Sequence, residues 1–145
     1  MGYTITQIED AIVAKIQASA VLTALNATIA SYHGEIDDLV KQAAQLTIKL
    51  PAIYAFYGGS AFDESANRSF DDEMNFTVIA IAKDLRGDAK LKAAMYPILE
   101  ELKTVLIDNN LDLDIEPLHP IRIERTLITK LFSIYSFDIK TSFSL

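Results

Sequence analysis

The sequence predicts an α+β fold in which a mostly antiparallel sheet of about four strands is flanked by helices. Helical and strand patterns do not alternate one for one, and two pairs of strand segments are joined too briefly for parallel crossovers. The length of 145 residues fits one domain spanning residues 1–145. Half of the residues are apolar, which excludes disorder over most of the chain.

An amphipathic helix is predicted for residues 4–19. Its start is left open, because Thr4 with Gln7 and Thr6 with Glu9 both have the spacing of a capping box. The apolar residues that recur at helical spacing are Ile5, Ile8, Ile12 and Ile16.

The secondary structure of the following stretch, residues 21–32, is ambiguous from the sequence. Its alanines favour a helix, whereas its threonines, asparagine and serine weaken one. A further helix is expected after a break at Gly34, with acidic residues in its first turn. Its apolar stripe would consist of Ile36, Leu39, Val40, Ala43 and Leu46.

Two strands are predicted in the middle of the chain. Residues 52–57 have a strand composition that should end at Gly58-Gly59, where positive φ is expected. Residues 60–73 are polar and acidic without periodicity and predict an exposed loop. Residues 74–83 are apolar on both faces, which is typical of a central strand covered on both sides.

The clearest element is a helix over residues 88–108. Asp88 is a candidate N-cap, Asn109-Asn110 a candidate stop, and the apolar stripe continues in phase across Pro97. The stripe consists of Leu91, Met95, Ile98, Leu99, Leu102, Val105 and Leu106.

The chain from Ile115 onward is β-rich. Residues 121–124 and 135–139 alternate between apolar and polar side chains. The apolar phase slips by one residue between them, which predicts a turn or β-bulge at 129–133. The apolar C-terminal strand is expected at a sheet edge, where a neighbouring subunit would pair with it.

Composition excludes several classes of function. There is no cysteine, which excludes disulfides, thiol nucleophiles and thiolate metal sites. A net charge of −7 argues against nucleic acid as the main partner, and the basic group Arg122, Arg125 and Lys130 is interrupted by Glu124. No apolar run is long enough to span a bilayer, and the N-terminal residues lack the pattern of a secretory signal, so we expect an intracellular protein without membrane association.

Recognisable site motifs are absent from the sequence. Gly58-Gly59 lacks the residues of a phosphate loop, and His33 and His119 lack the partner of a helical zinc site. Two acidic groups lack the spacing of a calcium loop and are expected to be solvated. We therefore expect no catalytic residue, metal or cofactor. The acidic groups are Asp63, Glu64, Asp71, Asp72 and Glu73, and Asp108, Asp112, Asp114 and Glu116.

One enzymatic alternative is a metal-dependent nuclease. Asp138-Ile139-Lys140 on a predicted strand is similar to the second half of the PD-(D/E)xK motif, in which carboxylates hold the metal and a lysine helps to activate water. Asp114 or Glu116 would have to supply the other carboxylate. The same residues also fit the polar face of an amphipathic strand. An unrelated small protein-binding module is a further alternative.

The stretch from Ser31 to Phe62, SYHGEIDDLVKQAAQLTIKLPAIYAFYGGSAF, resembles a small protein family of Mu-like phages and prophages. The resemblance rests on Tyr-x-Gly-Glu, an intervening helix, and Leu-Pro-Ala-Ile before an apolar strand. His33 stands where a second glycine would be expected. The family is encoded among tail genes and long carried the label of unknown function.

This resemblance implies a structural tail-assembly protein, and a terminator that caps the tail tube is its most specific form. Tail terminators combine a sheet with flanking helices and close into rings, commonly hexamers. The implied partners are other copies of the chain and tail tube or sheath proteins. The implied location is the bacterial cytoplasm during assembly and then the virion tail. The family has no known catalytic residues to carry over.

Overall fold

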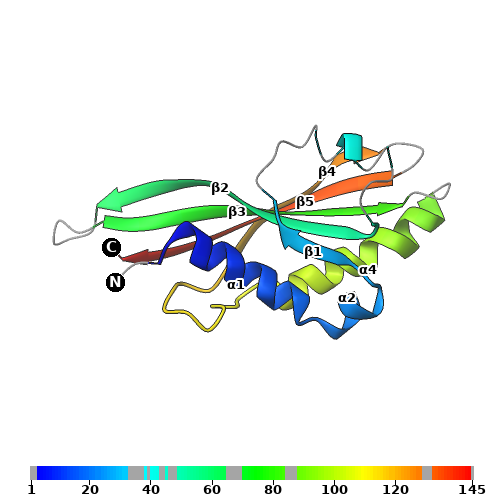
Figure 1. Cartoon of the computed structure of the whole chain (residues 1–145). Helices are drawn as coiled ribbons and strands as arrows, with labels where there is room; N and C mark the ends of the chain where they lie inside the picture. The colour runs from blue at the N-terminus through cyan, green and yellow to red at the C-terminus, as the bar shows by residue number, and fades with distance from the viewer. Residues whose placement is uncertain are drawn as a thin grey trace.

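The computed structural model describes residues 3–32, 38, 40–42, 45, 49–64, 70–83, 88–128 and 132–144. Five strands form one sheet in the order β1-β2-β3-β5-β4 (Figure 1). Among the described strands, only β1 and β2 pair in parallel, which confirms an α+β fold with a mostly antiparallel sheet. The elements are α1 (Ile5–Gln17), α2 (Ala20–Ala24), β1 (Thr28–Ser31), β2 (Ala52–Glu64), β3 (Phe70–Lys83), α4 (Asp88–Leu106), β4 (His119–Ile128) and β5 (Phe132–Ser144).

Helix α1 begins at the Thr4 capping box. The Thr4 hydroxyl accepts a hydrogen bond from the Gln7 backbone N–H at 3.1 Å, and the Gln7 side chain accepts one from the Thr4 N–H at 2.8 Å. The other candidate pair does not cap the helix, because Thr6 and Glu9 both lie within it. Ile5 in the first turn is exposed, whereas the remaining isoleucines of the stripe, Ile8, Ile12 and Ile16, are fully buried.

The ambiguous stretch 21–32 divides into a short helix and a strand. Ser19 caps α2, Asn26 reverses the chain with a φ of 54°, and β1 then adds a fifth strand beside β2. Most of the helix expected after Gly34 lies outside the described residues. Within it, Asp38 and residues 40–42 are helical.

The loop predicted for residues 60–73 is wrong at both of its ends, and residues 65–69 lie outside the described residues. Residues 60–64 extend β2 and residues 70–73 begin β3, and the two strands pair antiparallel until Glu64 lies opposite Phe70. Gly58-Gly59 does not end the strand either, because a β-bulge between Tyr57 and Gly59 absorbs the glycine pair. No apolar alternation marked these residues as a strand, because most of this end of the hairpin is exposed.

Gly59 provides a test of this bulge. Its φ of 133° is rarely adopted by residues with a side chain, whereas a Cβ added at Gly58 would meet its nearest neighbour, the Asn75 carbonyl oxygen, at 3.4 Å. We expect Gly59→Ala to lower the free energy of unfolding by about 1–3 kcal/mol. Gly58→Ala is the matched control and should cost less. Urea unfolding of both variants measures the difference, and equal costs would contradict the backbone conformation at Gly59.

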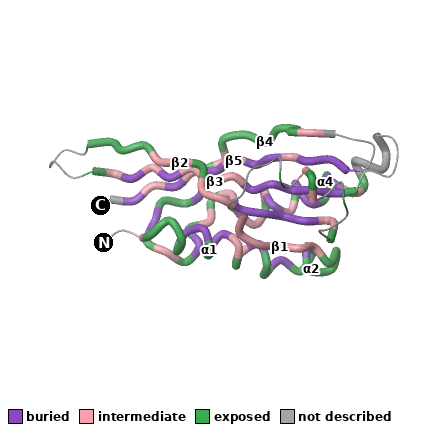
Figure 2. The backbone as a smooth tube through the Cα atoms, turned by 45° about the horizontal axis from the view of Figure 1, so that its top comes forward, coloured by how far each residue is buried: buried purple, intermediate pink, exposed green. Residues whose placement is uncertain are grey.

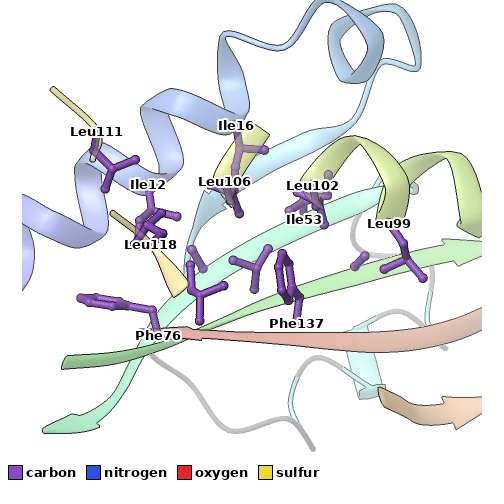
Figure 3. Packing of buried hydrophobic residues seen from close by; sticks show 14 of the residues in the cluster. Ile12, Ile16, Ile53, Phe76, Leu99, Leu102, Leu106, Leu111, Leu118 and Phe137 are labelled. Atoms are coloured by element: carbon purple, nitrogen blue, oxygen red, sulfur yellow. The ribbon is translucent and has the colours of Figure 1, made fainter. Parts of the chain in front are cut away.

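Helices α1 and α4 lie on one face of the sheet (Figure 1). Figure 3 shows their apolar side chains facing those of β2, β3 and β5, all of which belong to one buried cluster. A second buried cluster lies on the other face and includes Tyr54, Ile79 and Phe132. Strand β3 contributes to both clusters, which confirms the prediction of a central strand covered on both sides.

Helix α4 runs through Pro97 to Leu106, as predicted. Beyond it, the Asn109 side chain donates to the Val105 carbonyl at 3.3 Å and accepts from the Leu111 N–H at 2.7 Å. These bonds link the last turn to the loop that follows. The predicted stop at Asn109-Asn110 is therefore close to the observed end of the helix.

The expectation that the C-terminal strand forms an edge is wrong. β5 lies between β3 and β4, and Phe143 is buried against the Tyr3 ring. The predicted turn at 129–133 lies partly outside the described residues, since 129–131 are not described and β5 begins at Phe132. Register shifts within β4 instead occur after Pro120 and after Arg125.

Candidate functional site

A polar band crosses the sheet on the face opposite α1 and α4. Asp138 lies at its centre, where one carboxylate oxygen accepts from the Thr77 hydroxyl at 2.7 Å and the other from Arg122 Nε at 2.9 Å. The hydrogen bond with Asp138, together with the nearby Glu124 charge, raises the pKa of Arg122. Arginine is charged at any physiological pH, and the Arg122 guanidinium is the ion-pair partner of Asp138.

Lys140 lies two residues further along the same face of β5. Its ammonium group is 3.6 Å from a Glu73 carboxylate oxygen. Glu73, Lys140, Glu116 and His119 line a shallow pocket of about 160 Å³. The structure therefore places one of the two proposed extra carboxylates, Glu116, near Lys140.

Asp114, the other proposed carboxylate, lies beside the N-terminal segment, where its backbone N–H donates to the Tyr3 hydroxyl. No group of three or more His, Asp or Glu residues in the described part of the chain could hold a metal ion. His33 lies outside the described residues, and His119 is exposed at the start of β4.

The acidic residues of the predicted loop lie on the hairpin formed by β2 and β3. Asp63 is directly opposite Asp71, so two like charges face each other across the strands. Asp72 is buried opposite Phe62 on one side and Phe143 on the other. The hairpin therefore combines a high acidic charge with aromatic side chains.

Two of these aromatic side chains are exposed to solvent. Phe62 is 58% exposed and Phe70 is 48% exposed. The pairs Phe62–Asp72 and Glu64–Phe70 lie two residues apart along the ladder, so both rings project from the same face of the hairpin. Figure 2 shows exposed residues at this end of β2 and buried residues in the middle of the sheet. We call Phe62 and Phe70 the aromatic pair.

The opposite end of the sheet carries an apolar pocket of about 270 Å³. It lies where β2 begins and β3 ends, beside α2 and α4. We call it the end pocket. Lys83 is the one charged side chain among its described lining residues, which are Leu25, Leu50, Pro51, Ala82, Lys83, Ala93, Ala94 and Pro97.

The sequence contains a signal for the aromatic pair but none for the end pocket. Phe62 and Phe70 are large apolar residues in an otherwise polar stretch, which is a mark of a contact surface when the stretch is exposed. The end pocket had no comparable signal, because its residues come from four separate segments of the chain. Among the described helices, none is long and apolar enough to cross a membrane.

The mostly antiparallel five-stranded sheet covered on one face by α1 and α4 defines the chain as an α+β protein. The chain is similar to a chain of the solved structure described as "Virion of native gene transfer agent (GTA) particle", with a TM-score of 0.66 and 17% sequence identity. The match covers 99% of this chain and 100% of that chain. At this identity, the similarity establishes the shared fold.

A family match identifies the chain more narrowly. Residues 4–144 match the family described as "Bacteriophage Mu, Gp37", and the chain belongs to this family. The match confirms the resemblance to a Mu-like phage family and covers nearly the whole chain. A search of curated proteins found no match.

Proposed function

We propose that this protein is a structural subunit of a phage tail, and that it acts as a terminator that closes the tail tube with a homo-oligomeric ring. The observation that carries the proposal is the match to the Mu Gp37 family over residues 4–144. The similarity in fold to a chain of a gene transfer agent virion supports a place in an assembled particle. The subunit assembles in the bacterial cytoplasm and becomes part of the virion tail.

The proposal requires a contact that closes. Subunits joined head to tail form a ring if the rotation between them closes and a filament if it does not. A ring that ends a tube must close, because an open contact would continue to add subunits. The terminator therefore needs two different surfaces on each subunit, and the tail tube provides a template on which the ring can form.

Light scattering over a range of concentrations tests the proposal, with and without tail-tube protein from the same phage or prophage. We expect closed oligomers of one size, and electron microscopy should show them at the ends of tubes. Hexamers would match the usual terminator ring. A monomer under all conditions that neither binds tubes nor changes their length would overturn the proposal.

The nuclease alternative is not favoured by the geometry, since Asp138 is already held by Thr77 and Arg122. We expect no cleavage of plasmid DNA in Mg²⁺. Lys140→Ala is the matching control, because it removes the proposed catalytic amine and leaves the Asp138 hydrogen bonds in place. Cleavage by the native chain that Lys140→Ala abolishes would establish an enzyme instead.

A further inference from the structure

We propose that the aromatic pair of one subunit docks into the end pocket of a second copy of this chain. This inference rests on the proposed function, because it assigns the two surfaces through which a ring would close. The occupant of the pocket is a phenylalanine ring from the β2–β3 hairpin, and the contact joins subunits head to tail.

The aromatic pair has the properties of an interface anchor. Phe62 and Phe70 each expose about half of the side chain or more, on the same face of the hairpin. Aromatic side chains that fill a partner's pocket contribute a large share of binding energy at interfaces. Residues 61–64 of β2 are all exposed, so the approach of a partner to Phe62 is open.

The end pocket matches a phenyl ring in size and polarity. An apolar protein cavity of about 150 Å³ can bind benzene, and the end pocket measures about 270 Å³. Its lining is formed by leucine, alanine and proline side chains with Lys83. A phenyl ring inserted there would bury apolar surface. Because the phenylalanine side chain has no polar atom, no hydrogen-bonding group would be left unpaired.

The charges beside the two surfaces are complementary. Glu64 lies opposite Phe70 and shares the face of the aromatic pair, whereas Asp63 and Asp71 alternate onto the other face of the hairpin. Lys83 is exposed where it lines the end pocket. Docking brings this ammonium group toward the Glu64 carboxylate, which favours a second copy of this acidic chain in one orientation.

The two surfaces cannot meet within one molecule. The hairpin and the end pocket lie at opposite ends of β2 and β3 (Figure 1). β2 alone has 13 residues, and a strand of that length spans roughly 40 Å. A contact between them is therefore intermolecular. In the proposed head-to-tail arrangement each copy offers its hairpin to one neighbour and its pocket to another, which is the heterologous type that generates a ring when it closes.

Complementation between two variants tests this contact. The double variant F62A/F70A lacks the aromatic pair and keeps the end pocket, whereas Ala93→Trp fills the pocket and keeps the aromatic pair. We expect each variant alone to have a dissociation constant at least about tenfold higher than the native chain, since each removes an anchor. An equimolar mixture should form one-to-one dimers that do not grow, because only one complete contact remains. Analytical ultracentrifugation, with and without tail-tube protein, measures both results.

Ile121→Ala is the matched control, because it also truncates an exposed apolar side chain, on β4 and away from both surfaces. It should assemble like the native chain, and thermal melts should show all variants folded. Rings of normal size from both F62A/F70A and Ala93→Trp would overturn the docking contact and leave the terminator proposal intact. Normal rings that no longer bind tubes when the aromatic pair is lost would assign the hairpin to the tube instead. A native chain that never assembles would overturn both proposals.

Discussion

Replacing Phe76 with alanine should lower the free energy of unfolding by about 3–5 kcal/mol. Phe76 is fully buried in the central strand and packs edge-on against the Tyr57 ring, with ring centroids 5.7 Å apart. Truncation removes apolar contacts on the face covered by α1 and α4 and leaves a cavity that a paired strand cannot collapse around. Urea unfolding monitored by circular dichroism gives the change.

Phe62→Ala is the matched control for this result, since it makes the same chemical change on the neighbouring strand at a side chain that is 58% exposed. Its effect on the isolated subunit should stay within about 0.5 kcal/mol. A similar loss of stability in both variants would show that the hairpin, like the centre of the sheet, is packed in the isolated chain. The same variant pair therefore separates stability from assembly.

Leu102→Ala should cost about 2–5 kcal/mol. The Leu102 side chain is completely buried, where α4 packs on the core of the sheet. Alanine is a strong helix former, so the loss would come from packing and not from helix propensity. Thermal unfolding and urea unfolding should both show that the variant is less stable than the native chain.

Thr104→Ala provides the control on the opposite side of the same helix, where Thr104 is exposed and its hydroxyl donates to the Glu100 carbonyl. We expect little change or a small gain in stability, since alanine has the higher helix propensity. If Leu102→Ala were as mild as Thr104→Ala, the apolar stripe of α4 would not face the sheet.

Elements that carry their own periodicity were predictable from sequence. Residues 88–108 repeat apolar side chains at helical spacing because one side of α4 is buried, and the predicted limits differ from the observed ones by two residues at one end. The apolar faces of 74–83 placed β3 at the centre of the sheet for the same reason. In both cases burial imposes a pattern on the residues themselves.

Elements stabilised mainly by strand pairing were not predictable. Residues 60–64 and 70–73 are strands because backbone groups pair across the hairpin and, for β3, with β5. Backbone hydrogen bonds are available to any residue except proline, so exposed strands leave little trace in composition. β1 was missed for a related reason, because its four residues depend on pairing with β2.

The candidate site also combines features that are encoded locally with features that depend on strand pairing. Asp138 and Lys140 could be placed on one strand face from their spacing, but the choice between a metal ligand and an ion pair depended on Arg122, which only the β4–β5 register brings beside Asp138. Likewise, the sequence shows two phenylalanines in a polar stretch, whereas their position on a common face depends on the β2–β3 register.

The sequence by itself determined the α+β class, the buried faces of β3 and α4, and the resemblance to a Mu-like phage family. Each is encoded locally, in the periodicity of side chains or in a continuous motif. Only the tertiary structure decided that β5 is an inner strand, that an acidic hairpin replaces a loop, and that an apolar pocket lies at the far end of the sheet. These features arise from contacts between segments distant in the chain, and such contacts are set by the packing of the whole sheet.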